Sequence, residues 1–257
     1  MVFSAEPAAD GGLDRSRLTA VPWAALRAFK TRERVRLVLC VGGWERSARL
    51  AAVAADPGRR AAFAKSSLRV CLGDRLDGID IDWEHPADAA QQADYGRLLA
   101  AVRAAFDAYG LVLSVAAAGW QHLPLEGVAA VNWVNLMAYH HAGVQATFDA
   151  AQADVTAHNS RGCAGRQAQP RATLLRPTGG KGEVMAYRDI VLKHRLTPEA
   201  DGAGGLAFNG PATVRRKVEF ARTAGLGGVM VRELGQDAPP GDDSLLGVIR
   251  VAVRIGR

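Results

Sequence analysis

Three acidic residues alternate along the segment LDGIDIDWEHP, which runs from Leu76 to Pro86. If this segment is a β-strand, successive side chains point to opposite faces, so Asp80, Asp82 and Glu84 share one face. The two isoleucines and the tryptophan between them then share the other face and pack against helices. Neighbouring acids lie about 6.6 Å apart, because a strand rises about 3.3 Å per residue. We therefore expect three carboxyl groups in a row on one side of a strand.

The chemistry open to such a row depends on its surroundings. A solvated row of acids is typical of an antiparallel edge, whereas this segment lies between helical segments, where both faces of a strand are buried. Three like charges in a confined interior repel each other, so we expect at least one carboxyl to hold a proton near neutral pH. That arrangement suits general acid catalysis, in which one group donates a proton and another stabilises positive charge. A structural or metal-binding role is the alternative, although the spacing does not fit a helix-loop-helix calcium site.

The elements that must position these acids alternate between short apolar runs and longer helical patterns. We expect strands at residues 35–40, 78–83, 111–116, 133–139 and 228–231, and helices at residues 61–72, 88–109, 211–224 and 244–254. This alternation without return hairpins predicts a parallel sheet with helical crossovers in one domain, residues 1–257. A closed barrel and an open doubly wound sheet both fit the pattern. In a parallel barrel the chemistry lies at the C-terminal ends of the strands, which puts Glu84 nearest the substrate, Asp82 below it and Asp80 deeper.

Composition argues against several classes of protein. The 257 residues are 49% hydrophobic and 23% charged, which is typical of a folded chain, and no apolar run approaches the length of a membrane span. The net charge of +6 comes mainly from 27 arginines (32 basic residues less five lysines), which are scattered or paired with acids. We therefore expect no nucleic-acid partner and no membrane partner. Three cysteines without a CxxC spacing predict no metal site, and the N-terminal residues show no signal-peptide pattern.

Four segments together carry a resemblance to a known family. The segment DGIDIDWE, from Asp77 to Glu84, matches the DxxDxDxE signature of the family 18 glycoside hydrolases, the chitinase family. In the same order along the chain, CVGGW resembles the SxGGW of the third barrel strand, with Cys40 at the serine position. MAY resembles the MxYD of the sixth strand, and GGVMVRELGQD resembles the GGxMxWELGQD of the eighth. The resemblance covers nearly the whole chain except residues 145–185.

The resemblance implies an α/β fold, a (β/α)8 TIM barrel that hydrolyses β-1,4-linked N-acetylglucosamine polymers with the help of the substrate's own acetamido group. It implies that Glu84 protonates the glycosidic oxygen, and that Asp82 orients the acetamido group and stabilises the oxazolinium-like intermediate. It also implies that Asp80 lies beneath Asp82 and tunes it. In the same scheme Tyr139 hydrogen-bonds the acetamido carbonyl, and Met137 packs below the sugar.

The resemblance extends to residues around this centre. Gly43 and Trp44 belong to a motif that contributes to substrate binding, while Gly42 and Asp77 are expected to be structural. Trp44 and Trp120 each follow an apolar strand, where an aromatic ring can stack on a sugar or pack in the core. Both interpretations stay open for these two tryptophans.

Two substitutions depart from the family pattern at the expected substrate-binding site. The tryptophan at the end of strand eight is Arg232, whose guanidinium can stack on a sugar ring but favours ionised Glu84, the wrong form for a proton donor. The aspartate of MxYD is His140, which replaces an acceptor with a titratable group. We expect both residues at the substrate-binding site, where they favour reduced activity.

The chain also departs from a complete barrel. Residues 1–6 align with the second strand of the family, so the first strand is expected to be missing. Residues 160–183 are rich in Arg, Gly, Pro and Gln, and only Ala172 to Leu175 has strand character. We therefore predict an incomplete (β/α)8 barrel that lacks the first strand and has a degraded seventh strand.

The sequence thus predicts a chitinase-type glycosidase that cleaves chitin or chito-oligosaccharides by a substrate-assisted retaining mechanism, with impaired activity as one outcome. A non-hydrolytic chitin-binding relative and an inactive, decayed homologue are the alternatives. A nucleotide-binding α/β protein is disfavoured because the sequence has no phosphate loop. We expect no cofactor, no metal and a monomer, and a secreted location follows only from the substrate.

Overall fold

The computed structural model describes residues 1–139, 146–160, 169–173, 178–179 and 185–254. They divide into two compact units. Of the described residues, the first unit contains 1–117, 121–134 and 169, and the second contains 118–120, 135–160, 170–173, 178–179 and 185–254. Within the described residues, no helix combines the length and the apolar character that a membrane span requires.

The first unit is built on a parallel sheet. Strand β3 (Val38–Gly42) pairs in parallel with β1 (Val2–Pro7) on one side and with β4 (Gly78–Asp82) on the other. Strand β4 in turn pairs in parallel with β5 (Val112–Ala118), and the short β2 (Leu13–Asp14) runs antiparallel to β1. The predicted parallel pairing is confirmed for β1, β3, β4 and β5, whereas the antiparallel β2 departs from the expected absence of return hairpins. Strand β4 lies between two neighbours, as a buried strand must.

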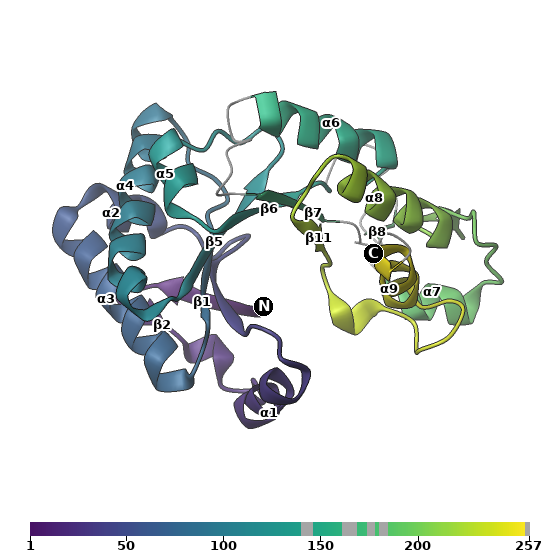
Figure 1. The fold of residues 1–257 in the computed structure, drawn as a ribbon, viewed down its shortest axis with the longest axis horizontal. Coiled ribbons are helices and arrows are strands. Elements are labelled where there is room, and N and C mark those ends of the chain that lie inside the picture. Colours follow the sequence, from purple (N-terminus) through teal and green to yellow (C-terminus); the bar gives the residue numbers. More distant parts are fainter. Residues whose placement is uncertain (140–145, 161–168, 174–177, 180–184, 255–257) are drawn as a thin grey trace. The chain divides into compact units, whose positions relative to one another are not determined.

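Helices cover these strands and supply the crossovers between them (Figure 1). The α-helices of this unit are α1 (Trp23–Glu33), α2 (Leu50–Ala55), α3 (Pro57–Asp74), α4 (Ala89–Phe106) and α5 (Leu125–Ala130), and the 3-10 helices are η1 (Ser16–Leu18) and η2 (Asp107–Tyr109). Figure 1 shows α2 to α5 grouped on one side of the strands. Ile79 and Ile81 of β4 are fully buried in the core with Phe63 of α3 and Leu98 of α4. The isoleucine face of β4 therefore packs against helices, as the alternation predicted.

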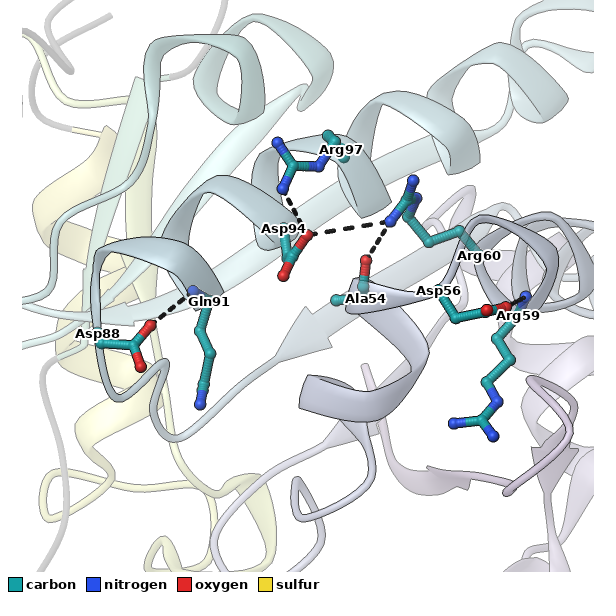
Figure 2. A network of polar contacts seen from close by, with 8 residues as sticks. All are labelled: Ala54, Asp56, Arg59, Arg60, Asp88, Gln91, Asp94 and Arg97. Atoms are coloured by element: carbon teal, nitrogen blue, oxygen red, sulfur yellow. Dashed lines mark hydrogen bonds and ion pairs between the residues drawn. The ribbon is translucent and has the colours of Figure 1, made fainter.

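Two of these helices begin at an aspartate that caps them (Figure 2). The Asp56 carboxylate accepts the backbone N–H of Arg59 at 2.7 Å at the start of α3, and Asp88 accepts that of Gln91 at 2.8 Å at the start of α4. Each cap satisfies an N–H that has no partner inside its helix and stabilises the helix by about 1 kcal/mol. Both helix starts are therefore encoded locally.

An arginine joins three helices beside these caps (Figure 2). Arg60 of α3 donates to the carbonyl oxygen of Ala54 in α2 at 2.5 Å, and its guanidinium lies 4.0 Å from the Asp94 carboxylate of α4. Arg97 contacts the same carboxylate at 2.6 Å from one turn along α4. The network fixes the outer layer of helices that supports β4 from behind.

The second unit contains a pair of parallel strands, a small antiparallel sheet and four helices among its described residues. Its strands are the end of β6 (Trp133–Met137), β7 (Gln169–Thr173), β8 (Thr178–Gly179), β9 (Gly202–Ala203), β10 (Leu206–Ala207) and β11 (Gly228–Met230). Its α-helices are α6 (Phe148–His158), α7 (Tyr187–Lys193), α8 (Pro211–Thr223) and α9 (Leu245–Arg254), and the 3-10 helix η5 (Leu234–Gln236) lies between β11 and α9. Strand β10 pairs antiparallel with β8 and β9. Helices α8 and α9 pack together over the apolar cluster of this unit.

The seventh strand begins three residues earlier than predicted and overlaps the predicted segment at residues 172 and 173. Strand β7 covers 169–173 rather than 172–175, and residues 171–173 pair in parallel with 228–230 of β11. Residues 174 and 175 lie outside the described part of the chain. The segment QPRAT has no apolar run to mark it as a strand, but parallel pairing uses backbone donors and acceptors that every non-proline residue has. The strand that we expect to be missing before β1 stays a prediction.

A buried lysine is the main electrostatic feature of the second unit. Lys217 of α8 is 2% exposed, and its ammonium donates to Asn209 Oδ1 at 2.8 Å and to the carbonyl oxygen of Ala146. Burial lowers the pKa of the Lys217 ammonium to about 8, an effect that the charges of Asp201 and Asp154 partly oppose. The lysine thus joins α8 to two loops of its unit, and burying its charge is costly.

Replacing Lys217 with methionine tests this cost through its pH dependence. Below pH 8 the folded and unfolded chains both carry the charge, so the folded chain bears the full penalty of burying it. Between pH 8 and 10.5 the folded chain releases the proton while the unfolded chain keeps it, so stability rises with pH by up to about 3 kcal/mol. We expect the unfolding free energy of the wild type, minus that of Lys217→Met, to increase from pH 7 to pH 10 in urea unfolding. The same difference for the exposed Lys193→Met should stay flat, and a flat result for both would contradict the assignment.

Gly78 and Gly73 form a matched pair for testing the entry into β4. Gly78 begins β4 with φ +156°, and a Cβ atom there would lie 1.9 Å from the carbonyl oxygen of Val112. We expect Gly78→Ala to lower the free energy of unfolding by about 2–4 kcal/mol, because both the backbone and the strand spacing would have to shift. Gly73 lies in α3, where a Cβ atom would meet no atom within 4 Å other than those of its chain neighbours and its own helix backbone, so Gly73→Ala should stabilise the chain by up to about 1 kcal/mol. Thermal unfolding distinguishes the two, and equal effects would contradict this interpretation of the strand entry.

Candidate active site

Strand β4 presents the three acids as a graded row. Asp80 is 1% exposed in the middle of the strand, and Asp82, its last residue, is 6% exposed. Glu84 lies two residues beyond the strand, with 13% of its side chain exposed. The acids alternate with the buried Ile79 and Ile81, so they occupy the opposite face of β4. Exposure increases toward the C-terminal end, which is where a parallel strand delivers its chemistry.

A serine on the neighbouring strand holds the deepest acid. Ser114 of β5 lies directly opposite Asp80 in the ladder, and its hydroxyl donates to Asp80 Oδ1 at 2.5 Å. Cys40 lies opposite Asp80 on the other side, in β3, at the position where the family motif has serine. The sequence gives no sign of Ser114, because only the register between β4 and β5 shows that the two side chains meet. A hydrogen bond to an ionised carboxylate is stronger than one between neutral groups, which makes this contact a firm anchor.

Two glycines bring the end of β3 onto the end of β4. Gly42 lies opposite Asp82 in the ladder with φ +100°, and a Cβ atom there would lie 2.3 Å from the carbonyl oxygen of Asp82. Gly43 has φ +101°, its N–H donates to the same oxygen at 2.7 Å, and its Cβ would strike the ring of Phe3 at 2.4 Å. Both positions therefore require glycine, for conformation and for space. The motif glycines predicted from sequence sit beside the middle acid of the row.

A histidine accompanies the outermost acid. The Nε2 atom of His85 lies 3.7 Å from Glu84 Oε2, and its Nδ1 atom lies 2.9 Å from Gln121 Oε1. An amide oxygen can only accept, so Nδ1 carries the proton in this contact and Nε2 faces the Glu84 carboxyl group. His85 lies in the loop after β4, and the sequence gives no sign of Gln121 as its partner.

Asp77 lies at the opposite end of β4, just before its first residue. It precedes β4, where its carboxylate accepts the backbone N–H of Leu37 at 2.6 Å and pairs with the ammonium of Lys30 at 2.8 Å. It thus ties the start of β4 to α1 and to the residue before β3. This arrangement agrees with the structural role that we expect for Asp77, away from the chemistry.

The two candidate sugar-stacking tryptophans are not core residues. Trp44 follows the diglycine of the first unit and is 67% exposed, while Trp120, assigned to the second unit, follows β5 and is 63% exposed. The core interpretation is therefore excluded for both. An exposed indole ring that follows a parallel strand is of a type that can stack on a sugar ring.

The remaining predicted residues of the second unit also lie at strand ends. Met137 is the last residue of β6 and is buried, and Tyr139 follows two residues later and is half-buried. Arg232 lies two residues beyond β11 and is half-buried. His140 lies outside the described residues. Across the described ranges, no group of three His, Cys, Asp or Glu side chains is arranged to hold a metal ion.

A comparison with protein families identifies the class to which this fold and this row of acids belong. The sequence model of the glycosyl hydrolases family 18 matches residues 12–174. The match spans more than half of the chain, and the chain belongs to this family.

Individual relatives agree with this assignment. The chain is 28% identical over 278 residues to Endochitinase 1 of Metarhizium robertsii, covering 85% of this chain and 65% of that protein. It is 27% identical over 277 residues to Chitinase 1 of Aphanocladium album, covering 84% of this chain and again 65% of the relative. The chain therefore spans about 65% of the length of these two relatives.

Solved structures of the family show the same fold. A family 18 chitinase of Flavobacterium johnsoniae superposes with a TM-score of 0.82 at 21% identity, covering 97% of this chain and 84% of that one. A class V chitinase of Nicotiana tobaccum, in complex with NAG4, has a TM-score of 0.82 at 19% identity, with 98% and 90% covered. A chitinase-like agglutinin of Robinia pseudoacacia has a TM-score of 0.79 at 18% identity, with 98% and 91% covered. At these identities the likeness shows the fold, and the predicted α/β architecture of the (β/α)8 barrel class is confirmed.

The contact between Ser114 and Asp80 can be tested by a double-mutant cycle. We expect Ser114→Ala to lower the free energy of unfolding by about 1–3 kcal/mol, because the buried Asp80 carboxylate loses the hydroxyl that solvates it. In an Asp80→Ala background the same substitution should cost less, since no carboxylate remains to be solvated. Urea unfolding of the four proteins gives the coupling energy, and a value near zero would show that the pair does not interact.

Proposed function

We propose that the chain is a glycoside hydrolase that cleaves β-1,4-linked N-acetylglucosamine polymers, chitin or chito-oligosaccharides, by a substrate-assisted retaining mechanism. The observation that carries the proposal is the graded row of acids on β4, with Glu84 beyond the strand end and Asp82 buried below it. Family membership supports the reaction class. The class V chitinase of Nicotiana tobaccum supports the substrate class, since that relative was solved in complex with NAG4.

In the first step, the protonated carboxyl group of Glu84 donates its proton to the glycosidic oxygen. The acetamido oxygen of the substrate attacks the anomeric carbon from the opposite side, the glycosidic bond breaks, and the shortened chain leaves as an alcohol. The cyclic oxazolinium that remains carries positive charge, which the Asp82 carboxylate stabilises. An intramolecular nucleophile carries a large effective concentration, so the protein need not supply one of its own.

In the second step, ionised Glu84 removes a proton from a water molecule that attacks the anomeric carbon. The bond to the acetamido oxygen breaks, and the sugar is released with retained configuration. Glu84 thus regains the proton that it gave away, and the cycle closes. The position of Glu84 suits both steps, because 13% of its side chain is exposed and can meet the sugar first and the water afterwards.

The deeper acid has a supporting role in this scheme. Asp80 is enclosed below Asp82 and accepts the hydroxyl of Ser114, so a fixed dipole from β5 is aimed at its carboxylate. We expect this bond to keep the Asp80 carboxylate in one orientation beneath Asp82. A fixed carboxylate beneath Asp82 helps Asp82 meet the positive charge of the intermediate.

Residues at or just beyond the ends of other strands would hold the sugar. In the proposed complex the hydroxyl of Tyr139 donates to the acetamido carbonyl, and Met137 packs below the ring. Trp44 and Trp120 expose flat apolar faces that suit the faces of sugar rings. Chitin is a polymer found outside cells, so we propose a secreted protein.

One observation favours a second candidate function, a chitin-binding protein without turnover. The half-buried Arg232 stands where the family pattern has tryptophan, so a charged side chain replaces an apolar ring at that position. A chitinase-like agglutinin is among the structures that share this fold, so the fold itself is compatible with binding alone.

Replacement of Glu84 by glutamine tests the proposal. The amide keeps the size of the side chain but has no acidic proton, so turnover of a chromogenic chitobiose or chitotriose substrate should fall at least about 100-fold. The exposed Glu219→Gln removes a carboxylate on the surface of α8 and should leave turnover unchanged. Release of the chromophore is followed at pH 5 to 7.

Equal background rates for the wild type and Glu84→Gln would refute the hydrolase. If neither protein shows turnover but both bind chitin beads equally well, the result would favour the binding protein. Loss of both binding and turnover in a folded wild-type chain would favour a decayed homologue.

A further inference from the structure

The loop that follows β3 is folded into a tight turn. The backbone N–H of Arg46 donates to the carbonyl oxygen of Gly43 at 2.9 Å, and Glu45 adopts the left-handed conformation with φ +62°. The turn delivers Ser47 back toward the sheet, where it is only 5% exposed. A polar residue buried at this depth requires partners, and the partners it finds are specific.

The hydroxyl oxygen of Ser47 lies at the junction of two strand ends. It is 2.9 Å from the carbonyl oxygen of Gly43 and 2.9 Å from the carbonyl oxygen of Asp82. It is also 3.2 Å from the backbone nitrogen of Glu84. A hydroxyl has one hydrogen to donate and two lone pairs with which to accept, so it donates to one of the two carbonyls, or shares its hydrogen between them, while it accepts the N–H. One side chain therefore bridges the loop after β3 and the backbone of the outermost acid.

Glu84 needs such a partner because its strand has ended. The last pair in the ladder between β3 and β4 joins Gly42 and Asp82, so Glu84 lies two residues beyond the reach of that ladder. A backbone N–H that leaves a sheet in a half-buried place is costly without an acceptor. Ser47 supplies this acceptor from a side chain where the sheet no longer does.

We infer that Ser47 is a positioning residue for Glu84: its hydroxyl fixes the Glu84 backbone and thereby aims the carboxyl group. The inference rests on the proposed function of Glu84 as the proton donor. Small displacements of a reacting group lower rates steeply, and a misplacement of about 1 Å can cost about 100-fold. Ser47 is buried under the turn and contacts the acids only through the backbone of Asp82 and Glu84, so its loss should reduce kcat and leave KM nearly unchanged.

Ser47→Ala and a matched control test this role. We expect Ser47→Ala to lower kcat about 10- to 100-fold on the chromogenic substrate, with KM within about twofold of the wild type. Ser47→Cys keeps the volume but is a weak hydrogen-bonding group, so it should lose kcat as well, and it serves if the alanine variant does not fold. Ser67→Ala is the control, because Ser67 is fully buried in α3 and its hydroxyl has no hydrogen-bond partner among the described residues. Its kcat and KM should match the wild type.

A second measurement does not depend on turnover. Hydrogen exchange at the Glu84 amide, followed by NMR, should be at least about fivefold faster in Ser47→Ala than in the wild type, and unchanged in Ser67→Ala. If the wild type does not hydrolyse the substrate, the proposed function fails, and the exchange rate alone still decides whether Ser47 holds the Glu84 backbone. Unchanged exchange would overturn the inference, whatever happens to kcat. In an active enzyme, an unchanged kcat, a parallel rise in KM, or an equal loss in Ser67→Ala would also overturn it.

Discussion

The carbonyl oxygen of Asp82 is the atom on which the rest of the site depends. It receives the N–H of Gly43 at 2.7 Å and lies 2.9 Å from the hydroxyl of Ser47, while the missing side chain of Gly42 leaves room for it. Because these contacts come from the loop after β3 and the oxygen belongs to β4, they fix the ends of the two strands relative to each other. Glu84 leaves the sheet from that position, so the point from which its side chain extends is fixed by the same contacts.

A rigid support behind β4 is the other condition for this arrangement. Trp83 packs edge-on against Tyr95 with ring centroids 5.1 Å apart, and the Tyr95 hydroxyl donates to the carbonyl oxygen of Ile81. Burial raises the pKa of Tyr95 well above its usual value, with the charges of Asp80 and Asp82 adding to the effect, so the phenol keeps the proton that it donates. The helical layer therefore contributes a neutral donor on one side of β4, while the acids occupy the other.

The row of acids was predictable because residue type alternates with the period of a strand, and the same pattern predicted the buried isoleucine face. The contact between Ser114 and Asp80 was not, since it depends on which residue of β5 stands opposite in the ladder. The role of Ser47 could not be predicted for a similar reason, because its hydrogen-bond partners are backbone atoms, which every residue has. The start of strand β7 was predicted three residues too late, since its pairing is made by the backbone and QPRAT has no apolar pattern.

The side chain of Phe3 lies directly against Gly43 at the end of the sheet. The ring of Phe3 occupies the space that a side chain at position 43 would fill, and the guanidinium of Arg46 covers the ring at 5.1 Å from its centroid. The two positions are therefore complementary in size, and a larger residue at one would require a smaller residue at the other. The aromatic side chain of β1 acts as a spacer that keeps the diglycine turn from closing further, so the first strand of this chain helps to set how closely that turn approaches the acids.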